Sequence, residues 1–535
     1  MTATRAMAQP TTLSGAEQRF LRIHADLGRQ STLLLQENPA SAHGLMRCDT
    51  ASARPRGIVY SAFSNAGTQG DFLPYDGRGA WDLRIGAAGT LPASDAGTLS
   101  GRIRYGRGQH CDVGWNATRQ AEYYRPYFST DSVGGTFTYD SYQAEGGYSF
   151  SAGACWTLGA KVSFLGEQAW RLTDPRALNN TTWLSFEAGA VRNSNGHLLL
   201  FGTGYARNKQ HMQLRYWRPG QQDRFFVCYG FGLYDTRKSS VSSGKSRMYY
   251  MDRLGGQVQY LSPQKKSVKV HAALQYSYFR MRTEEGDIYN LYESGTHVVT
   301  PLFRLGFDLS GVWELHLGFA GEVIVRQGME NIIEEYLIDP ANNIYDFRTI
   351  DTQRNYGFSG YHLSGTLELV RRFGASSAFL QTGVSSDGFR EHYRVGGYRI
   401  HCGSLTPHVK AGVRGGGVDS LEFSVLYGRK RVVSHGYEVD FSHSRIPHLD
   451  FQQAFAPYAW HASNLHHVTA SAVWTHRFGR YSAGLVLDVL LTCGARLPGI
   501  AFVDAIGFSS SAPMISPLPD VHHEQRLALT AFLIL

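Results

Sequence analysis

Histidine side chains gather in the C-terminal quarter of the sequence. Imidazole nitrogens bind zinc, iron and haem, so a group of them in one place would form a metal or haem site. Their spacing matches no compact ligand motif, and aromatic residues are equally frequent in the same stretch, which is typical of a folded loop that contacts a partner or a sugar. Both interpretations stay open. The candidate ligands are His435, His443, His448, His461, His466 and His467.

Carboxylates that alternate with apolar residues could pair with basic side chains as an acid–base constellation. The candidates are Glu314, Glu322, Glu368, Glu422 and Asp488, with Arg326, His316 and His362 as partners. Charged residues on one face of a strand are also what a large barrel needs to wet its interior. Because no G-x-S-x-G elbow and no Ser, His and Asp set is present, we expect no catalytic residues, no bound cofactor and no enzymatic activity.

Alternating strands must position these residues. From about residue 57 onward the main pattern has a period of two, as in residues 268–278 and 313–326, where apolar side chains occupy one face and small, polar or charged ones the other. These segments are about twice as long as soluble strands, which average roughly five or six residues. A tilted strand needs about 9 to 11 residues to cross a bilayer, with lipid on its apolar side. The pattern therefore predicts a transmembrane β-barrel.

Connection lengths support this prediction, because outer-membrane barrels alternate short periplasmic turns with longer extracellular loops. The short connections lie at 192–196, 262–266, 309–311, 372–375, 414–417 and 477–480, and the longer ones at 237–246, 282–293, 327–357, 388–396, 434–463 and 494–520. The last of these is apolar for an outer loop, so it could fold into the lumen, dock on a partner or pack on neighbouring loops.

The fold class that follows is all-β, a transmembrane antiparallel barrel of 16 to 20 strands. An even number places both ends of the wall in the periplasm, and 18 is our best value. The final segment, 527–535, alternates as a membrane strand, although Leu535 stands where a terminal aromatic residue is more usual.

The N-terminal region divides into two parts before the barrel of residues 57–535. Ala6-Met7-Ala8 resembles a signal-peptidase site without an apolar segment before it, so residues 1–8 are interpreted as the residual end of a signal peptide. Residues 9–56 are predicted to form a periplasmic or lumenal segment. A short helix is expected within residues 14–36, where Ser14 and Glu17 are spaced as a capping box.

Composition restricts the remaining function classes. The net charge of +8 is modest for 535 residues, and no recognition helix, zinc spacing or RNA-binding aromatic platform accompanies it, so nucleic acid is not expected as a partner. Anionic lipopolysaccharide or a partner protein would account for the basic excess equally well. The six cysteines are scattered and form no C-x-x-C pair, which argues against a zinc or redox module.

Several motifs between residues 98 and 192 indicate a family. They are Arg104-Tyr105-Gly106, Val113-Gly114-Trp115-Asn116, Arg125-Pro126-Tyr127, Asp131-Ser132-Val133-Gly134-Gly135, Gly146-Gly147-Tyr148 and Trp170-Arg171-Leu172-Thr173-Asp174-Pro175-Arg176. Together they resemble an uncharacterised outer-membrane barrel family of the Bacteroidota, with Ala177 and Trp170 as departures. The resemblance implies an outer-membrane location and a barrel fold, and a weak association with TonB-dependent transporters and surface lipoproteins. It implies no activity and no functional residues.

A shorter resemblance concerns Asn38-Pro39-Ala40. It is similar to the N-terminal motif of long-chain fatty-acid transporter barrels, whose N-terminal hatch sits in the lumen, although the strand count predicted here exceeds the 14 of that family. An ordinary turn is the competing interpretation.

Three function classes remain. The first is an accessory or ligand-binding barrel of a surface uptake complex, with outer-membrane lipids, lipopolysaccharide, a surface lipoprotein or a TonB-dependent receptor as partners. The second is an autonomous porin or transporter for a small nutrient, with an apolar nutrient as one option. An outer-membrane enzyme is the third and least favoured. A TonB-dependent receptor itself is disfavoured, because a plug domain would not fit beside 22 strands in this chain.

Overall fold

The computed structural model describes most of the barrel wall and parts of the connections. The described residues are 38–41, 43, 56–69, 74–94, 97–131, 133–215, 225–230, 233–235, 246–263, 267–285, 290–342, 344–438, 448–449, 458, 460–479, 481–496 and 521–534. No helix in this part of the chain is long and apolar enough to cross a membrane.

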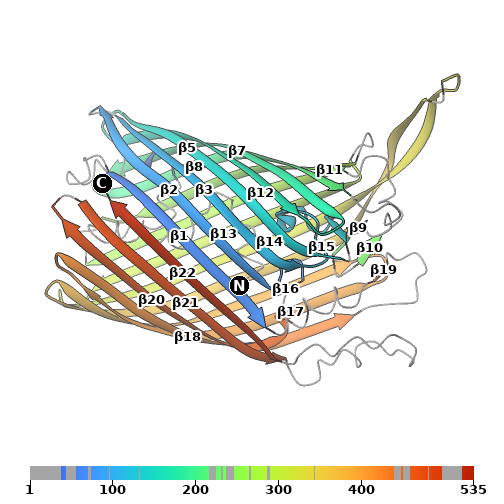
Figure 1. Cartoon of the computed structure of the whole chain (residues 1–535). Helices are drawn as coiled ribbons and strands as arrows, with labels where there is room; N and C mark the ends of the chain where they lie inside the picture. Colours follow the sequence, from blue (N-terminus) through green and yellow to red (C-terminus); the bar gives the residue numbers. More distant parts are fainter. Residues whose placement is uncertain are drawn as a thin grey trace.

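Eighteen strands of the described chain form one antiparallel sheet that closes on itself (Figure 1). Each strand pairs with its neighbours along the chain, and β1 closes the ring against β22. This confirms the predicted barrel and its 18 strands. The strands of the wall are β1 (Arg56–Gln69), β2 (Gly79–Ser94), β3 (Gly97–Val113), β5 (Gly135–Ala152), β6 (Trp156–Arg171), β7 (Arg176–Ser194), β8 (His197–Arg215), β11 (Ser246–Leu261), β12 (Val268–Glu285), β13 (Tyr292–Asp308), β14 (Trp313–Asp339), β15 (Ile344–Phe373), β16 (Ser376–Tyr393), β17 (Tyr398–Gly415), β18 (Asp419–Glu438), β20 (Ser463–Phe478), β21 (Tyr481–Arg496) and β22 (Val521–Ile534).

The two faces of the wall differ as the period-two pattern predicts. On β6, Leu158, Val162 and Phe164 point outward and are exposed. Ser163 and Leu165, which flank Phe164, point inward and are buried. An exterior covered with apolar side chains is stable in lipid and not in water. A closed sheet also leaves no unpaired strand edge within the hydrocarbon. The chain is therefore an outer-membrane β-barrel.

Short turns join the strands at one end of the barrel. The wall also begins at Arg56 and ends at Ile534 at this end, because β1 leads away from it and β22 returns to it. The end with short turns faces the periplasm in barrels of this class. The predicted short connections at residues 192–196, 309–311, 372–375 and 477–480 all lie at this end.

Two predicted extracellular loops are wrong, because much of each is strand. Within 327–357, β14 continues to Asp339 and β15 begins at Ile344, and within 388–396, β16 continues to Tyr393. Both faces of the longer hairpin meet water, so neither face is uniformly apolar and the period-two signal fades there. The predicted helix within 14–36 and the apolar stretch at 497–520 lie outside the described residues.

Candidate functional site

Loops from three parts of the chain meet at the outer end of the barrel. They contribute the strands β4 (Ser129–Asp131), β9 (Phe225–Cys228), β10 (Leu233–Asp235) and β19 (His448–Leu449), which form a second antiparallel sheet in the order β19-β10-β9-β4. The short helix α5 (Ala121–Tyr124) precedes β4. Figure 1 shows β9, β10 and β19 together at the outer rim. We call residues 114–131, 225–230, 233–235 and 448–449 the cap.

Tyrosines hold the cap against the inner wall. Tyr124 stacks on Tyr249 of β11 with ring centroids 4.4 Å apart, and Tyr127 stacks on Tyr292 of β13 at 4.7 Å. The hydroxyl of Tyr229 hydrogen-bonds to that of Tyr292 at 2.7 Å. All five rings are buried in the largest hydrophobic cluster of the described chain. Aromatic pairs of this kind add to the energy of burial, so the cap is a packed core inside the barrel and not a flexible surface loop.

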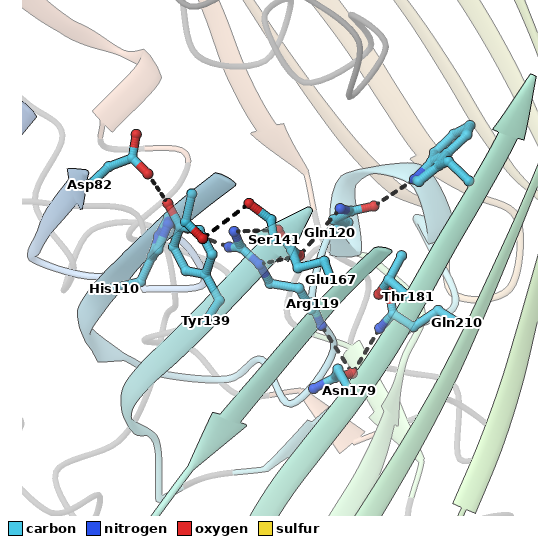
Figure 2. A network of polar contacts seen from close by, with 12 residues as sticks. Asp82, His110, Arg119, Gln120, Tyr139, Ser141, Glu167, Asn179, Thr181 and Gln210 are labelled. Carbon is cyan, nitrogen blue, oxygen red and sulfur yellow. Dashed lines mark hydrogen bonds and ion pairs between the residues drawn. The ribbon is translucent and has the colours of Figure 1, made fainter. Parts of the chain in front are cut away.

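Charged and amide groups anchor the start of the cap (Figure 2). Arg119 donates from Nε to Oε1 of Glu167 on β6 at 2.9 Å, and Gln120 donates to the same oxygen at 3.3 Å. The Arg119 guanidinium also lies over the ring of Tyr139, 4.3 Å from its centroid. On β7, Asn179 accepts the backbone N–H of Arg119 at 3.2 Å. A charge-assisted pair in a partly buried site is stronger than one in water, so removal of either charge would weaken this anchor.

A second anchor lies at the end of β4. Asp131 accepts a hydrogen bond from Nη2 of Arg171 at 2.7 Å, and both side chains are fully buried. The same Arg171 nitrogen donates to the carbonyl of Pro175 at 2.6 Å. Further round the ring, Arg326 of β14 donates to the carbonyl of Glu122 at 3.2 Å. The cap is thus bound to β6 and to β14, which lie on different sides of the ring.

The pKa of the Glu122 carboxyl is raised inside the cap. Burial raises its pKa from the ordinary 4.5 to about 7, and the nearby Arg119 lowers it by less than burial raises it. Glu122 therefore titrates near neutral pH inside the cap. Loss of its proton places a poorly solvated negative charge there.

Residues 38–41 and 43 lie in the lumen near the periplasmic end. Asn38 donates from Nδ2 to the carbonyl of Phe201 on β8 at 2.7 Å. His43 is held by both ring nitrogens, with Nδ1 3.0 Å from Oγ1 of Thr98 and Nε2 2.9 Å from Oγ of Ser151. The side chains of Asn38, Ala40, Ser41 and His43 are almost fully buried. We call residues 38–41 and 43 the latch.

Two glycines of the wall make room for the latch. A Cβ atom at Gly159 of β6 would lie 2.5 Å from the backbone nitrogen of Ala40, and one at Gly189 of β7 would overlap Oδ1 of Asn38. Asn38-Pro39-Ala40 therefore packs against the wall at two positions where any side chain larger than that of glycine would collide with it. A small cavity of about 40 Å³ lies beside Pro39, and Glu187 and Arg253 contribute to its lining.

The structure disperses the predicted histidine ligands. His435 hydrogen-bonds to Tyr458, and His461 packs edge-on against Phe389 with ring centroids 4.9 Å apart. His466 faces outward beside Tyr427, whereas His467 faces inward over Gly428. His443 and the side chain of His448 lie outside the described residues. Within the part of the chain that is described, no three His, Cys, Asp or Glu residues are grouped as metal ligands, and the metal site stays a prediction.

The predicted carboxylates form separate pairs along the wall. Glu314 contacts His316 at 3.3 Å and Arg372, and Glu422 contacts Arg414 at 3.2 Å. His362 lies 2.5 Å from Asp387 and opposite Glu322 on the next strand. Arg326, predicted as a carboxylate partner, instead donates to Thr296 and to the cap. These contacts do not assemble the predicted constellation.

Sequence reasoning missed the cap anchors. Arg125-Pro126-Tyr127 and the segment from Asp131 to Gly135 carry the family resemblance, but their role in filling the barrel was not predicted. The available signal was a connection between two strands that is rich in aromatic and charged residues instead of glycine and small polar residues.

Comparison with protein families gives one match. The model of a family of unknown function, DUF6850, matches residues 50–504. This agrees with the predicted membership of an uncharacterised family, and the bacterial phylum stays a prediction. No curated protein matches.

Solved structures with a similar chain path are outer-membrane receptors and transporters. BauA, the ferric preacinetobactin receptor of Acinetobacter baumannii, has 7% identity and a TM-score of 0.38, covering 89% of this chain and 80% of its own. The copper transporter OprC has 11% identity and a TM-score of 0.36, with coverage of 89% and 83%. A mutant of PfeA, the ferric enterobactin receptor of Pseudomonas aeruginosa, has 10% identity and a TM-score of 0.37, with coverage of 90% and 80%.

Proposed function

Since the chain belongs to DUF6850, a family of unknown function, we propose its role from its own geometry: an accessory outer-membrane barrel that docks a protein partner at the cell surface. The observation that carries this proposal is the long hairpin of β14 and β15. It projects far beyond the barrel rim (Figure 1, upper right). We call residues 331–339 and 344–355 the ribbon.

Beyond its base, where Asn331 and Asn355 hydrogen-bond to Leu291 and Arg394, the ribbon has no neighbouring strand among the described residues. Pairing of β14 with β13 ends at Glu330, and pairing of β15 with β16 begins at Tyr356. Beyond these residues the two strands pair only with each other, as far as Asp339 and Ile344. An isolated two-stranded hairpin is marginally stable in water, and its two free edges are open to another strand. A partner would supply the missing contacts.

The two faces of the ribbon are unlike. On one face Arg348 pairs with Glu334 at 2.6 Å, and Tyr336 donates to Asp346 at 3.1 Å. On the other face Leu337 lies opposite Tyr345, with 41% and 50% of their surfaces exposed. The charged groups of the first face are paired with each other, whereas on the second face Leu337 and Tyr345 leave large side chains in water. Exposed apolar patches with a polar rim mark interaction surfaces.

Charge specifies the partner further. The ribbon carries five carboxylates and two guanidinium groups, although the whole chain has a net charge of +8. The ribbon therefore fits a protein whose apolar groove has a basic rim. A surface lipoprotein or a TonB-dependent receptor are the classes of partner that we propose.

The cap agrees with an accessory role. Eighteen-stranded barrels enclose a wide lumen, and in this chain tyrosines and ion pairs of the cap fill the outer end of it. A packed core in the lumen hinders free diffusion of solutes through the barrel but leaves its outer surface available to a partner protein.

A gated transporter is the second candidate. The latch and the cap lie at opposite ends of the lumen and use separate contacts, so each could open without the other. This arrangement would admit a small ligand in two steps. Under this alternative, we propose that the transported ligand is apolar.

The test is purification of the native barrel from its outer membrane in mild detergent, followed by direct binding of the protein recovered with it. Leu337→Ser with Tyr345→Ser should weaken that binding at least tenfold, because roughly 1.5–3 kcal/mol accompanies burial of each large side chain. The matched control, Glu334→Gln with Arg348→Gln, changes only the polar face and should leave binding within about threefold. Recovery of the barrel alone, or equal effects of the two variants, would contradict docking through the apolar face.

A further inference from the structure

The exterior of β18 changes character in one step. Leu421, Phe423, Val425 and Tyr427 point outward and are 37–54% exposed, which makes them part of the lipid-facing band. The next two outward residues are Arg429 and Arg431, both exposed. Because they continue the same alternation toward the outer end, both guanidinium groups leave the wall directly above the hydrocarbon band.

Aromatic and apolar groups surround the two arginines. The hydroxyl of Tyr427 is 2.8 Å from Nδ1 of His466, which lies opposite Arg429 on β20. Leu405 of β17 lies opposite Arg431 and is 40% exposed, and Val433 is 62% exposed. Tyrosine is typical of the interface between acyl chains and headgroups, so the arginines stand at headgroup level with exposed apolar surface at their side.

Three other outward arginines on the outer half of the wall have carboxylate partners. Arg107 lies 3.7 Å from Asp140, Arg207 lies 3.8 Å from Asp252, and Arg280 lies 3.0 Å from Glu293. Among the described residues, Arg429 and Arg431 make no hydrogen bond, ion pair or ring contact. Two residues on one strand face are about 7 Å apart, so two guanidinium groups here concentrate positive charge without internal compensation.

We propose that Arg429 and Arg431 bind the phosphate headgroup, of net negative charge, of a lipid in the outer leaflet, with its acyl chains along Leu405 and the apolar band below. A guanidinium binds phosphate through paired N–H donors, and each basic residue near an anionic lipid surface strengthens binding by about fivefold. Free phosphate would use the same donors but would gain nothing from the apolar flank. The site does not depend on the docking role of the ribbon.

The test is binding of short-chain phosphatidylglycerol to the full-length barrel in neutral detergent, with phosphatidylcholine of the same chain length and inorganic phosphate as comparison ligands. Arg429→Gln with Arg431→Gln should lower the affinity for phosphatidylglycerol by about twenty-five-fold, since two guanidinium groups are lost. Affinity for phosphatidylcholine should change less than twofold, and inorganic phosphate should bind far more weakly than phosphatidylglycerol.

The matched control is Arg207→Gln with Arg280→Gln, which removes two outward arginines that already have carboxylate partners. This control should keep the native affinity within about threefold. Heat-dependent migration on gels establishes that both variants retain the barrel. Equal losses in the two variants, or equal binding of the two lipids by the native protein, would overturn the proposal, and binding of inorganic phosphate as tight as that of phosphatidylglycerol would reassign the site to a free anion.

Discussion

Glu122 shows how a single buried carboxyl can couple the cap to pH. Its ordinary pKa of 4.5 applies to the detached cap, and the raised pKa of about 7 applies to the packed cap. Between these values the packed state binds more protons than the detached state. The stability of the cap is therefore complete below pH 4.5 and falls as the pH rises through about 7.

Glu122→Gln should remove this pH dependence and should stabilise the cap at pH 8 by about 2 kcal/mol, since each unit of pKa shift corresponds to roughly 1.4 kcal/mol and partial exposure reduces the effect. Amide hydrogen exchange of residues 117–131, compared between native protein and variant at each pH, measures the difference. A ratio of protection that stays constant from pH 5 to pH 8 would show that Glu122 does not control the packing.

At the scale of single elements, glycines decide where the N-terminal segment can lie. Strands tolerate glycine at a cost in stability, and a glycine in the wall often marks a close approach of another backbone. Gly159 and Gly189 face the latch on adjacent strands, whereas Gly146 on β5 has no atom near the place of a Cβ. This contrast separates a local effect on the latch from a general effect on strand stability.

Gly189→Ala should displace Asn38 and expose the latch, because the added methyl group overlaps the amide oxygen of that residue. Faster amide exchange at residues 40, 41 and 43, by tenfold or more, is the expected result. Gly146→Ala is the control and should leave exchange of these amides unchanged. Equal exchange in both variants would mean that the latch does not need the glycine at position 189.

At the scale of the whole molecule, closure of the lumen separates the two candidate functions. Replacement of residues 116–131 by a short Gly-Ser linker should convert a barrel of low conductance into an open channel in planar bilayers, because it removes the tyrosine core and both ion-pair anchors. Removal of ribbon residues 334–351 is the control and should leave conductance at the native level. A large steady conductance of the native protein would favour the transporter and weaken the accessory role.

The sequence alone determined the wall of this protein. In segments such as 268–278 and 481–491, lipid on one side and the lumen on the other impose an alternation that needs no knowledge of distant residues, and short turns alternate with long connections for the same reason. Where both faces meet water, as in residues 331–355, that constraint disappears, and the ribbon was predicted as a loop.

Only the tertiary structure decided what fills the barrel. The contact of Arg119 with Glu167 crosses 48 positions, that of Tyr124 with Tyr249 crosses more than a hundred, and the seat of Asn38 joins it to Phe201. No local periodicity encodes such pairs, because each depends on which strands become neighbours once the ring has closed. The wall also sends His466 and His467 to opposite sides, since alternate residues of a barrel strand point to opposite sides of the wall.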